Sequence, residues 1–261
     1  MSLAKEWLIP VARTLVKHSA TGPVYSLGDQ ITSLTPEYAL RRLRHAGLLR
    51  NPNVPIIPSH ENPRMVSFQT VLAMLGLQDY YDIDLNGKAA ITCDFAQPIS
   101  AQLRGQAGVV VDIGTSEHIF DLPQVFKNIV DLLQPGGVVL HLAPLSWYNH
   151  GFVNFNPVFF KEFYEHNQFS SLEHGLIVTP FEYALQSVLG RLGLEQRYHE
   201  SGMTPLSFFW DDESKTIDRF ANSVGVSARI IFLYAARKSR DITPVNVPCQ
   251  GIYRRRSERS T

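Results

Sequence analysis

The sequence predicts an α/β fold in which helices cover both faces of a mostly parallel sheet. Two β-branched runs, GVVVDI at 108–113 and VVLHLAP at 138–144, are typical of strands buried on both faces. Between them, apolar residues recur at helical spacing, namely Leu122, Val125, Phe126, Ile129, Val130 and Leu133. A strand, a helix and a second strand in one short crossover force the two strands to run parallel.

In chain order, the first expected element is an amphipathic helix over residues 1–19. Its apolar residues are interrupted by charged side chains and Pro10, whereas a secretory signal needs an unbroken apolar run. GPVYSLGDQ at 22–30 is then expected to form a strand that ends in a glycine turn. DYYDIDL at 79–85 and AAITCD at 89–94 are expected to form the next two strands.

The later elements follow from capping and periodicity. Asp121 is placed to cap the helix that follows it, and QPGG at 134–137 is expected to stop that helix before the next strand. The segment 156–169 has one broad apolar face and is expected to be helical. SARIIFLYAAR at 227–237 is expected to form the last strand.

The chain is expected to fold as a single α/β domain over residues 1–240. Two stretches, at about 32–66 and about 180–224, interrupt the pattern and are interpreted as insertions on one scaffold. The first combines a basic helix with a loop rich in Pro and Asn. Residues 241–261 are basic and polar, as expected of a flexible tail.

Composition limits the classes of partner. The 261 residues contain 24 basic and 24 acidic side chains, so no global field attracts nucleic acid or an anionic membrane. The expected partner is a small-molecule substrate, and the sequence leaves a homo-oligomer open. Only two cysteines occur, Cys93 and Cys249, without a disulfide framework, which favours a reducing, cytoplasmic setting.

Polar residues follow the two clearest strands. GTSEHIF begins at Gly114, and LSWYNHGFVNFNP spans 145–157. Open parallel sheets bind ligands outside the carboxyl ends of their strands. We therefore expect these two segments to share one cleft.

Several segments, taken in order, resemble class I S-adenosylmethionine-dependent methyltransferases. They are VYSLGDQ, YYDIDLNG, ITCDFAQPI, VVVDIGTSEHIFD, VFKNIVDLLQPGGVVLHLAP and FFKEFYEHNQF, which lie at about 22–30 and 79–170. The resemblance implies a Rossmann-like, mostly parallel seven-stranded sheet of methyltransferase type. It also implies S-adenosylmethionine as the cofactor.

By this resemblance, the cofactor's methionine part would lie at Gly28, its ribose at Asp84 and its adenine near Asp94. The loop containing Gly114, Thr115, Glu117 and His118 would border cofactor and substrate. The first loop departs from the family pattern, because Gly28 is followed by Asp29 and Gln30 where further glycines are usual. The interval from Gly28 to Asp84 is also far longer than the roughly 20 residues of a compact dinucleotide unit.

Each of these residues has a structural alternative. Asp84 lies two positions from Asp82 and before an Asn-Gly pair, so it can also belong to a solvated turn. Asp94 precedes a loop, where Asp commonly serves as a cap or turn residue. The polar side chains of residues 115–117 can equally solvate the turn before the helix that Asp121 caps.

The segment 147–157 combines flat aromatic faces with hydrogen-bonding groups, as a substrate pocket does. The residues assigned to its wall are Trp147, Tyr148, Asn149, Phe152 and Asn154. His150 is the candidate base that removes a proton from the acceptor during methyl transfer. The alternative is that the aromatic residues pack in the core.

Four possible ligands, Glu117, His118, His141 and His150, lie toward the same edge, but their spacing is not that of a helical zinc motif. No metal is therefore predicted, and His141, in mid-strand, is expected to be a buried, hydrogen-bonded imidazole. The predicted function is methyl transfer to a small molecule by in-line displacement. A non-catalytic binding or scaffold protein of the same fold is the alternative, and a dehydrogenase is disfavoured because no Gly-x-Gly-x-x-Gly follows the first strand.

Overall fold

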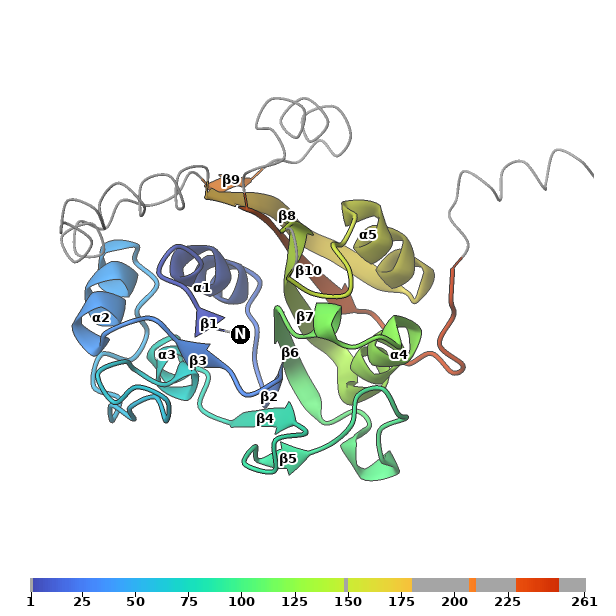
Figure 1. Cartoon of the computed structure of the whole chain (residues 1–261), viewed down its shortest axis with the longest axis horizontal. Coiled ribbons are helices and arrows are strands. Elements are labelled where there is room, and N and C mark those ends of the chain that lie inside the picture. The colour runs from blue at the N-terminus through green and yellow to red at the C-terminus, as the bar shows by residue number, and fades with distance from the viewer. Residues whose placement is uncertain (1, 148–149, 180–206, 210–228, 249–261) are drawn as a thin grey trace, which may run out of the picture.

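The computed structural model describes residues 2–147, 150–179, 207–209 and 229–248. An eight-stranded sheet with the order β5-β4-β2-β6-β7-β10-β8-β9 runs through the centre of the molecule (Figure 1). Parallel pairing links β5, β4, β2, β6 and β7, whereas β10 is antiparallel to both β7 and β8. This arrangement confirms the expected α/β, Rossmann-like, mostly parallel sheet, with the short β9 as an additional edge strand.

The strands of this sheet have the following bounds: β2 Val24–Leu27, β4 Tyr80–Asp84, β5 Ile91–Thr92, β6 Ala107–Ile113, β7 Leu133–Ser146, β8 Phe169–Thr179, β9 Ser207–Phe209 and β10 Arg229–Lys238. A separate pair is formed by β1, Ser2–Leu3, and β3, Ile31–Thr32, which run parallel to each other.

Helices cover both faces of the sheet (Figure 1). Helices α1 (Leu8–Lys17), α2 (Pro36–His45) and α3 (Phe68–Met74) pack on one face, and α4 (Leu122–Leu132) and α5 (Pro157–His166) pack on the other. The alternation of side chains along β6 divides the core accordingly. Val109 and Val111 join the cluster with α1, α2 and α3, whereas Val110 joins the cluster with α4 and α5.

Most elements expected from the sequence are present. Asp121 caps α4 through a hydrogen bond from the backbone N–H of Gln124. Asn156 and Thr35 cap α5 and α2 in the same way. At the N-terminus, however, only residues 8–17 are helical, because residues 2–3 pair with β3 instead.

The helix ends before QPGG as expected, but QPGG itself belongs to the strand that follows. Helix α4 ends at Leu132 and β7 begins at Leu133, which pairs with Ala107. After this pair the register shifts, and the next pair along the two strands joins Val109 of β6 to Val138 of β7. The residues QPGG are therefore extra residues in the first part of β7, where they form a bulge.

The first insertion contains α2, and α3 follows it directly; both helices lie with α1 over the same face of the sheet (Figure 1). The second insertion, at 180–224, lies outside the described residues except for β9, as does the tail from residue 249. Among the described helices, none combines the length and the apolar character needed to cross a bilayer.

Candidate functional site

Five neighbouring parallel strands end at the same edge of the sheet. In spatial order they are β5, β4, β2, β6 and β7, and their last residues are Thr92, Asp84, Leu27, Ile113 and Ser146. Because the strands are parallel, the loops that follow them leave from one rim. In the sequence, the residues predicted for the cofactor and the substrate lie at these strand ends or after them.

The loop after β2 is fixed to the ends of both neighbouring strands. The backbone N–H of Gly28 donates to the carbonyl of Ile83 at 2.8 Å, and that of Asp29 donates to Oδ2 of Asp84 at 2.9 Å. Toward β6, the hydroxyl of Thr115 donates to the carbonyl of Leu27 at 2.8 Å. The structure therefore brings Gly28, Asp84 and Thr115 together.

Gly28 is required at its position for two separate reasons. Its φ of +76° is in the left-handed region, and an added Cβ would lie 2.7 Å from Oγ1 of Thr115. Gly47 provides a matched control, because its φ is +69° but nothing lies within 4 Å of an added Cβ.

We expect Gly28→Ala to lower the free energy of unfolding by about 2–3 kcal/mol and Gly47→Ala by about 1 kcal/mol. The difference reflects displacement of Thr115 and loss of its hydrogen bond to Leu27. Urea denaturation of the two variants checks this expectation. Equal losses would show that Thr115 does not restrict the loop.

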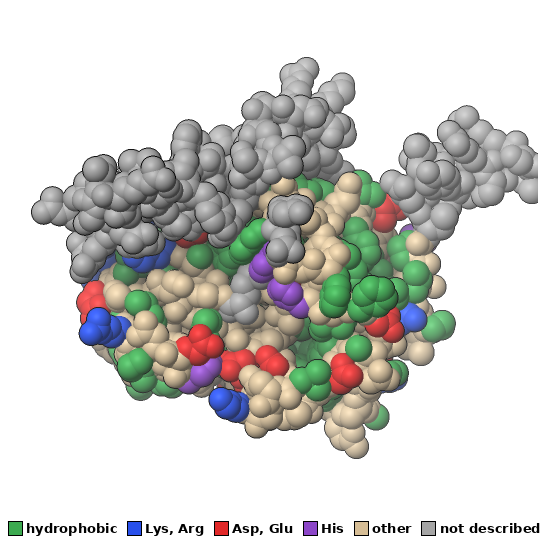
Figure 2. Space-filling view, in the orientation of Figure 1, with side chains coloured by type: hydrophobic (Ala, Val, Ile, Leu, Met, Phe, Trp, Pro, Cys, Tyr) green, Lys and Arg blue, Asp and Glu red, His purple; other side chains and the backbone are tan. Residues whose placement is uncertain are grey.

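Acidic side chains gather on the rim near the ends of β2 and β4. Asp29 pairs with His60 at 3.3 Å and accepts a hydrogen bond from the side-chain amide of Asn86 at 3.4 Å. Burial, followed by the charges of Asp82 and Asp84, raises the pKa of Asp29, while His60 opposes the shift. Figure 2 shows a group of acidic side chains on the lower part of this face, below histidine side chains near its centre.

Asp84 and Asp94 also shape their own loops. Oδ1 of Asp84 accepts the backbone N–H of Asn86, and Oδ1 of Asp94 accepts that of Ala96. Both side chains are partly exposed. Each carboxylate therefore stabilises a turn, as the structural alternative predicts. The carboxylate oxygens still have lone pairs that can accept a hydrogen bond from a further donor.

The loop after β6 is held in place by a buried carboxylate, Asp112. Its Oδ1 accepts the backbone N–H groups of Thr115 and Ser116, at 3.1 and 3.2 Å. Its Oδ2 lies 2.9 Å from Nδ1 of His141, whose Nε2 lies 2.7 Å from the hydroxyl of Tyr164. These contacts confirm that His141 is a buried, hydrogen-bonded imidazole.

The same network determines the ionisation of Asp112. Burial alone would raise the pKa of this carboxyl, but the hydrogen bond and charge of His141, helped by Ser116 and Thr115, leave the pKa below its usual value. Asp112 is thus a buried anion stabilised by its donors. It positions the start of the loop that contains Glu117 and His118.

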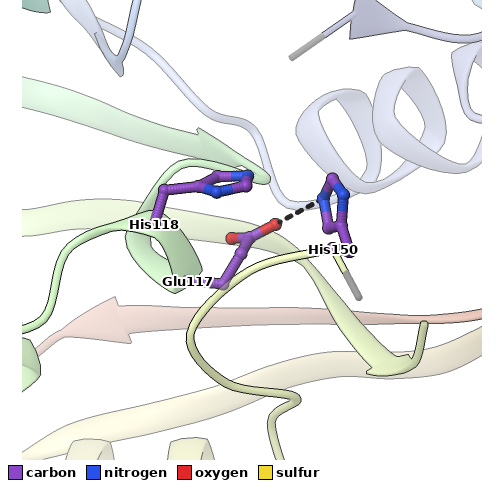
Figure 3. A group of neighbouring side chains, drawn as sticks. All are labelled: Glu117, His118 and His150. Atoms are coloured by element: carbon purple, nitrogen blue, oxygen red, sulfur yellow. Dashed lines mark ion pairs between the residues drawn. The ribbon is translucent and has the colours of Figure 1, made fainter. Parts of the chain in front are cut away.

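Glu117 differs from Asp112, because it is fully buried and neither of its carboxylate oxygens accepts a hydrogen bond from a described residue. The Nε2 atom of His150 lies 3.4 Å from Oε1 of Glu117 (Figure 3). Burial, and then the negative charge of Asp112, raise the pKa of Glu117 to about 8.

The rings of His118 and Trp147 both contact the ring of His150. The ring of His118 meets that of His150 edge to face, with centroids 4.8 Å apart. The indole of Trp147 stacks on the ring of His150 at a centroid distance of 3.7 Å. Burial lowers the pKa of His118, although its side chain is exposed at the surface.

The loop after β7 is folded against Glu117. The backbone N–H of Phe152 donates to the Glu117 carbonyl at 2.9 Å, and a Cβ added at Gly151 would lie 2.8 Å from that carbonyl oxygen. Side-chain Oδ1 of Asn154 accepts the N–H of Trp147 and closes the loop. The predicted substrate residues Tyr148 and Asn149 lie outside the described residues.

Phe152 takes a different position from the other predicted pocket residues. Its exposed ring meets the exposed ring of Phe120 edge to face, with centroids 5.6 Å apart. This pair presents apolar surface beside the site. Asn154, by contrast, is already committed to holding the loop.

Three residues of the site were not selected from the sequence. Asp112 orders the loop after β6, Gly151 permits close contact with Glu117, and Gln30 lies buried in the loop after β2. Gln30 donates to the carbonyl of Leu27 and to Thr115, but its Oε1 has no partner among the described residues. An acidic residue at the end of a buried strand was the available signal for Asp112.

No family model and no curated protein sequence matches the chain. Solved structures give distant likenesses. The provisionally assigned methyltransferase of Bacillus halodurans C-125 is 11% identical, with a TM-score of 0.46, and the match covers 88% of this chain and 99% of that one. The O-methyltransferase of a Brevibacillus brevis trans-AT polyketide synthase, in complex with S-adenosylhomocysteine, is 14% identical, with a TM-score of 0.41, over 88% and 71% of the two chains.

Phosphoethanolamine N-methyltransferase 2 of Haemonchus contortus is 14% identical, with a TM-score of 0.42, over 90% of this chain and 56% of that one. The match to the citrinin polyketide synthase CMeT domain, at 14% identity and a TM-score of 0.28, covers 48% of this chain and 29% of that one. All four TM-scores are below 0.5.

Proposed function

We propose that this chain is an S-adenosylmethionine-dependent methyltransferase that acts on a small molecule. The observation that carries the proposal is the direct bonding between the loops after β2, β4 and β6. Asp84 accepts the N–H of Asp29, and Thr115 binds the carbonyl of Leu27, so three strand ends form one rim. A nucleoside-sized ligand can contact all three loops at such a rim.

Individual side chains at the rim would bind different parts of the cofactor. The carboxylate of Asp84 has lone pairs left for ribose hydroxyls. The Oε1 of Gln30, which has no partner among the described residues, would accept a hydrogen bond from the ammonium group of the methionine part. Asp94, which follows the next strand, would face the adenine.

The acceptor would bind on the side of the loops after β6 and β7. Trp147 and the exposed pair Phe120 and Phe152 offer apolar surface, and His150 offers an imidazole within reach of Glu117. Methyl transfer needs alignment of the acceptor with the sulfonium methyl group and removal of the acceptor's proton. His150 is our candidate for the residue that promotes this proton loss.

Isothermal titration calorimetry of the purified protein with S-adenosylmethionine and S-adenosylhomocysteine tests the proposal. We expect both ligands to bind with one site per chain. If the folded protein binds neither ligand at high concentration, the proposal is rejected.

A non-catalytic binding or scaffold protein is the second candidate. The observation that favours it is the first loop, where Asp29 and Gln30 follow a single glycine and limit backbone approach to a ligand. This candidate predicts a stable protein partner bound through 32–66 or 180–224. Recovery of such a partner, together with no cofactor binding in the titration, would favour it.

A further inference from the structure

We propose that Glu117, His118 and His150 form a binding site for one divalent transition-metal ion of the zinc type. Glu117 and His118 come from the turn after β6 and His150 from the loop after β7, and the three side chains point toward one another (Figure 3). One ligand atom from each can be chosen so that all lie within 4.8 Å of one another. Two imidazoles and one carboxylate are a common ligand set for zinc and related ions.

The distance between Glu117 and His150 fits a shared cation. Two ligand atoms that bind one Zn²⁺ at about 2.0–2.1 Å in tetrahedral geometry lie about 3.3–3.4 Å apart. Nε2 of His150 and Oε1 of Glu117 are 3.4 Å apart. His118 is exposed, so a small rotation of its side chain can bring its ring nitrogen closer to the other two ligands.

The state of Glu117 is a second, independent observation. A buried carboxylate normally accepts several hydrogen bonds, as Asp112 does in the preceding strand. Glu117 is fully buried, and both of its oxygens lack hydrogen-bond donors among the described residues. A cation bound between Glu117 and His150 would provide the missing partner.

Other features would hold the ligands in place. The indole of Trp147 stacks on the ring of His150 and restricts its rotation. Gly151 lets the loop after β7 approach Glu117, and the Phe152 N–H binds the Glu117 carbonyl. The sequence spacing is not that of a helical zinc motif because the ligands come from two loops that only the parallel sheet brings together.

If the proposed methyl transfer is correct, this site also suits an acceptor that carries a metal-binding hydroxyl group. Three protein ligands leave a coordination position open, where the cation would hold the acceptor oxygen and favour loss of its proton to solvent. The oxygen lone pair then attacks the sulfonium methyl carbon, and the electrons of the broken C–S bond stay on sulfur. In this arrangement His150 acts as a ligand and not as a free base.

Calorimetric titration of chelator-treated protein with Zn²⁺ tests the site without any methyl transfer. We expect one Zn²⁺ per chain in the wild type. Glu117→Gln and His150→Ala should weaken binding by at least about 100-fold, since loss of a ligand should exceed the roughly 10–100-fold cost of losing an outer partner. His45→Ala removes an exposed histidine outside the cluster and should leave affinity within about twofold.

Binding of Co²⁺ supplies a second readout, because a four-coordinate cobalt site absorbs visible light. The band should appear in the wild type and in His45→Ala, and it should be absent in Glu117→Gln, a variant of nearly the same shape. No Zn²⁺ binding by the wild type, or equal binding by all variants, would overturn the proposal. Because S-adenosylmethionine is titrated separately, failure of the metal site and failure of the proposed function are distinguishable.

Discussion

Asp112→Ala is expected to lower the free energy of unfolding by about 3–5 kcal/mol. The substitution removes the acceptor for the N–H groups of Thr115 and Ser116, and it leaves His141 without the partner of its Nδ1. All of these groups are buried or nearly so, and water cannot replace the lost contacts. Urea denaturation followed by circular dichroism measures the loss.

Asp121→Ala is the matched control, because Asp121 also accepts a backbone N–H but lies at the surface. Its loss should cost about 1 kcal/mol. Should Asp112→Ala fail to fold, Asp112→Asn keeps an oxygen acceptor and should give an intermediate loss. A loss for Asp112→Ala no larger than that for Asp121→Ala would contradict the role assigned to this network.

The stabilisation of the folded protein by Asp112 depends on pH, and the direction of this dependence follows from the lowered pKa. Because the pKa of Asp112 is lower in the folded protein, the unfolded chain binds more protons in the acid range. The stabilisation by the Asp112 carboxylate is therefore fully present above the unfolded pKa of about 3.9 and is lost as pH falls through the folded value. The advantage of the wild type over Asp112→Asn should shrink over that range.

Asp84→Ala is expected to weaken the binding of S-adenosylmethionine by about 10–100-fold. A hydrogen bond to a charged group contributes about 1.5–3 kcal/mol, and the proposed ribose contact uses such bonds. The substitution also removes the acceptor for the Asp29 N–H, which helps to fix the first loop. Calorimetric titration measures the change.

Asp82→Ala is the control for this experiment. Asp82 lies on the same strand, two residues earlier, but its carboxylate accepts the N–H of Ala90 in the turn after β4. Cofactor affinity should therefore stay within a few-fold of the wild type, and circular dichroism should show both variants folded. Unchanged affinity in Asp84→Ala would remove Asp84 from the site.

Local sequence patterns were sufficient to predict much of the fold. The β-branched run of β6 predicts a strand buried on both faces, and all its residues are buried. Asp121 and Pro123 define the start of α4 because capping and the first helical turn depend on nearby residues only. Parallel strand order then places the predicted loops at one rim.

Features that depend on distant contacts were not predicted. The pairing of His141 with Asp112 and Tyr164 joins two strands and a helix, and no local spacing encodes it. Strand β8 (Phe169–Thr179) was missed because its sequence, FSSLEHGLIVT, lacks a continuous apolar run, and its pairing with β10 stabilises it. The contact between Glu117 and His150 likewise exists only once β6 and β7 lie side by side.

The central claim is that one rim, formed by the ends of parallel strands, holds the cofactor. Amide NMR spectra of labelled protein titrated with S-adenosylhomocysteine test it most directly. The account predicts that the amides of Gly28, Asp84, Asp94 and Gly114 shift together at one saturation point, while that of Gly47 does not move. No shift at saturating ligand, or shifts confined to residues away from these strand ends, would contradict it.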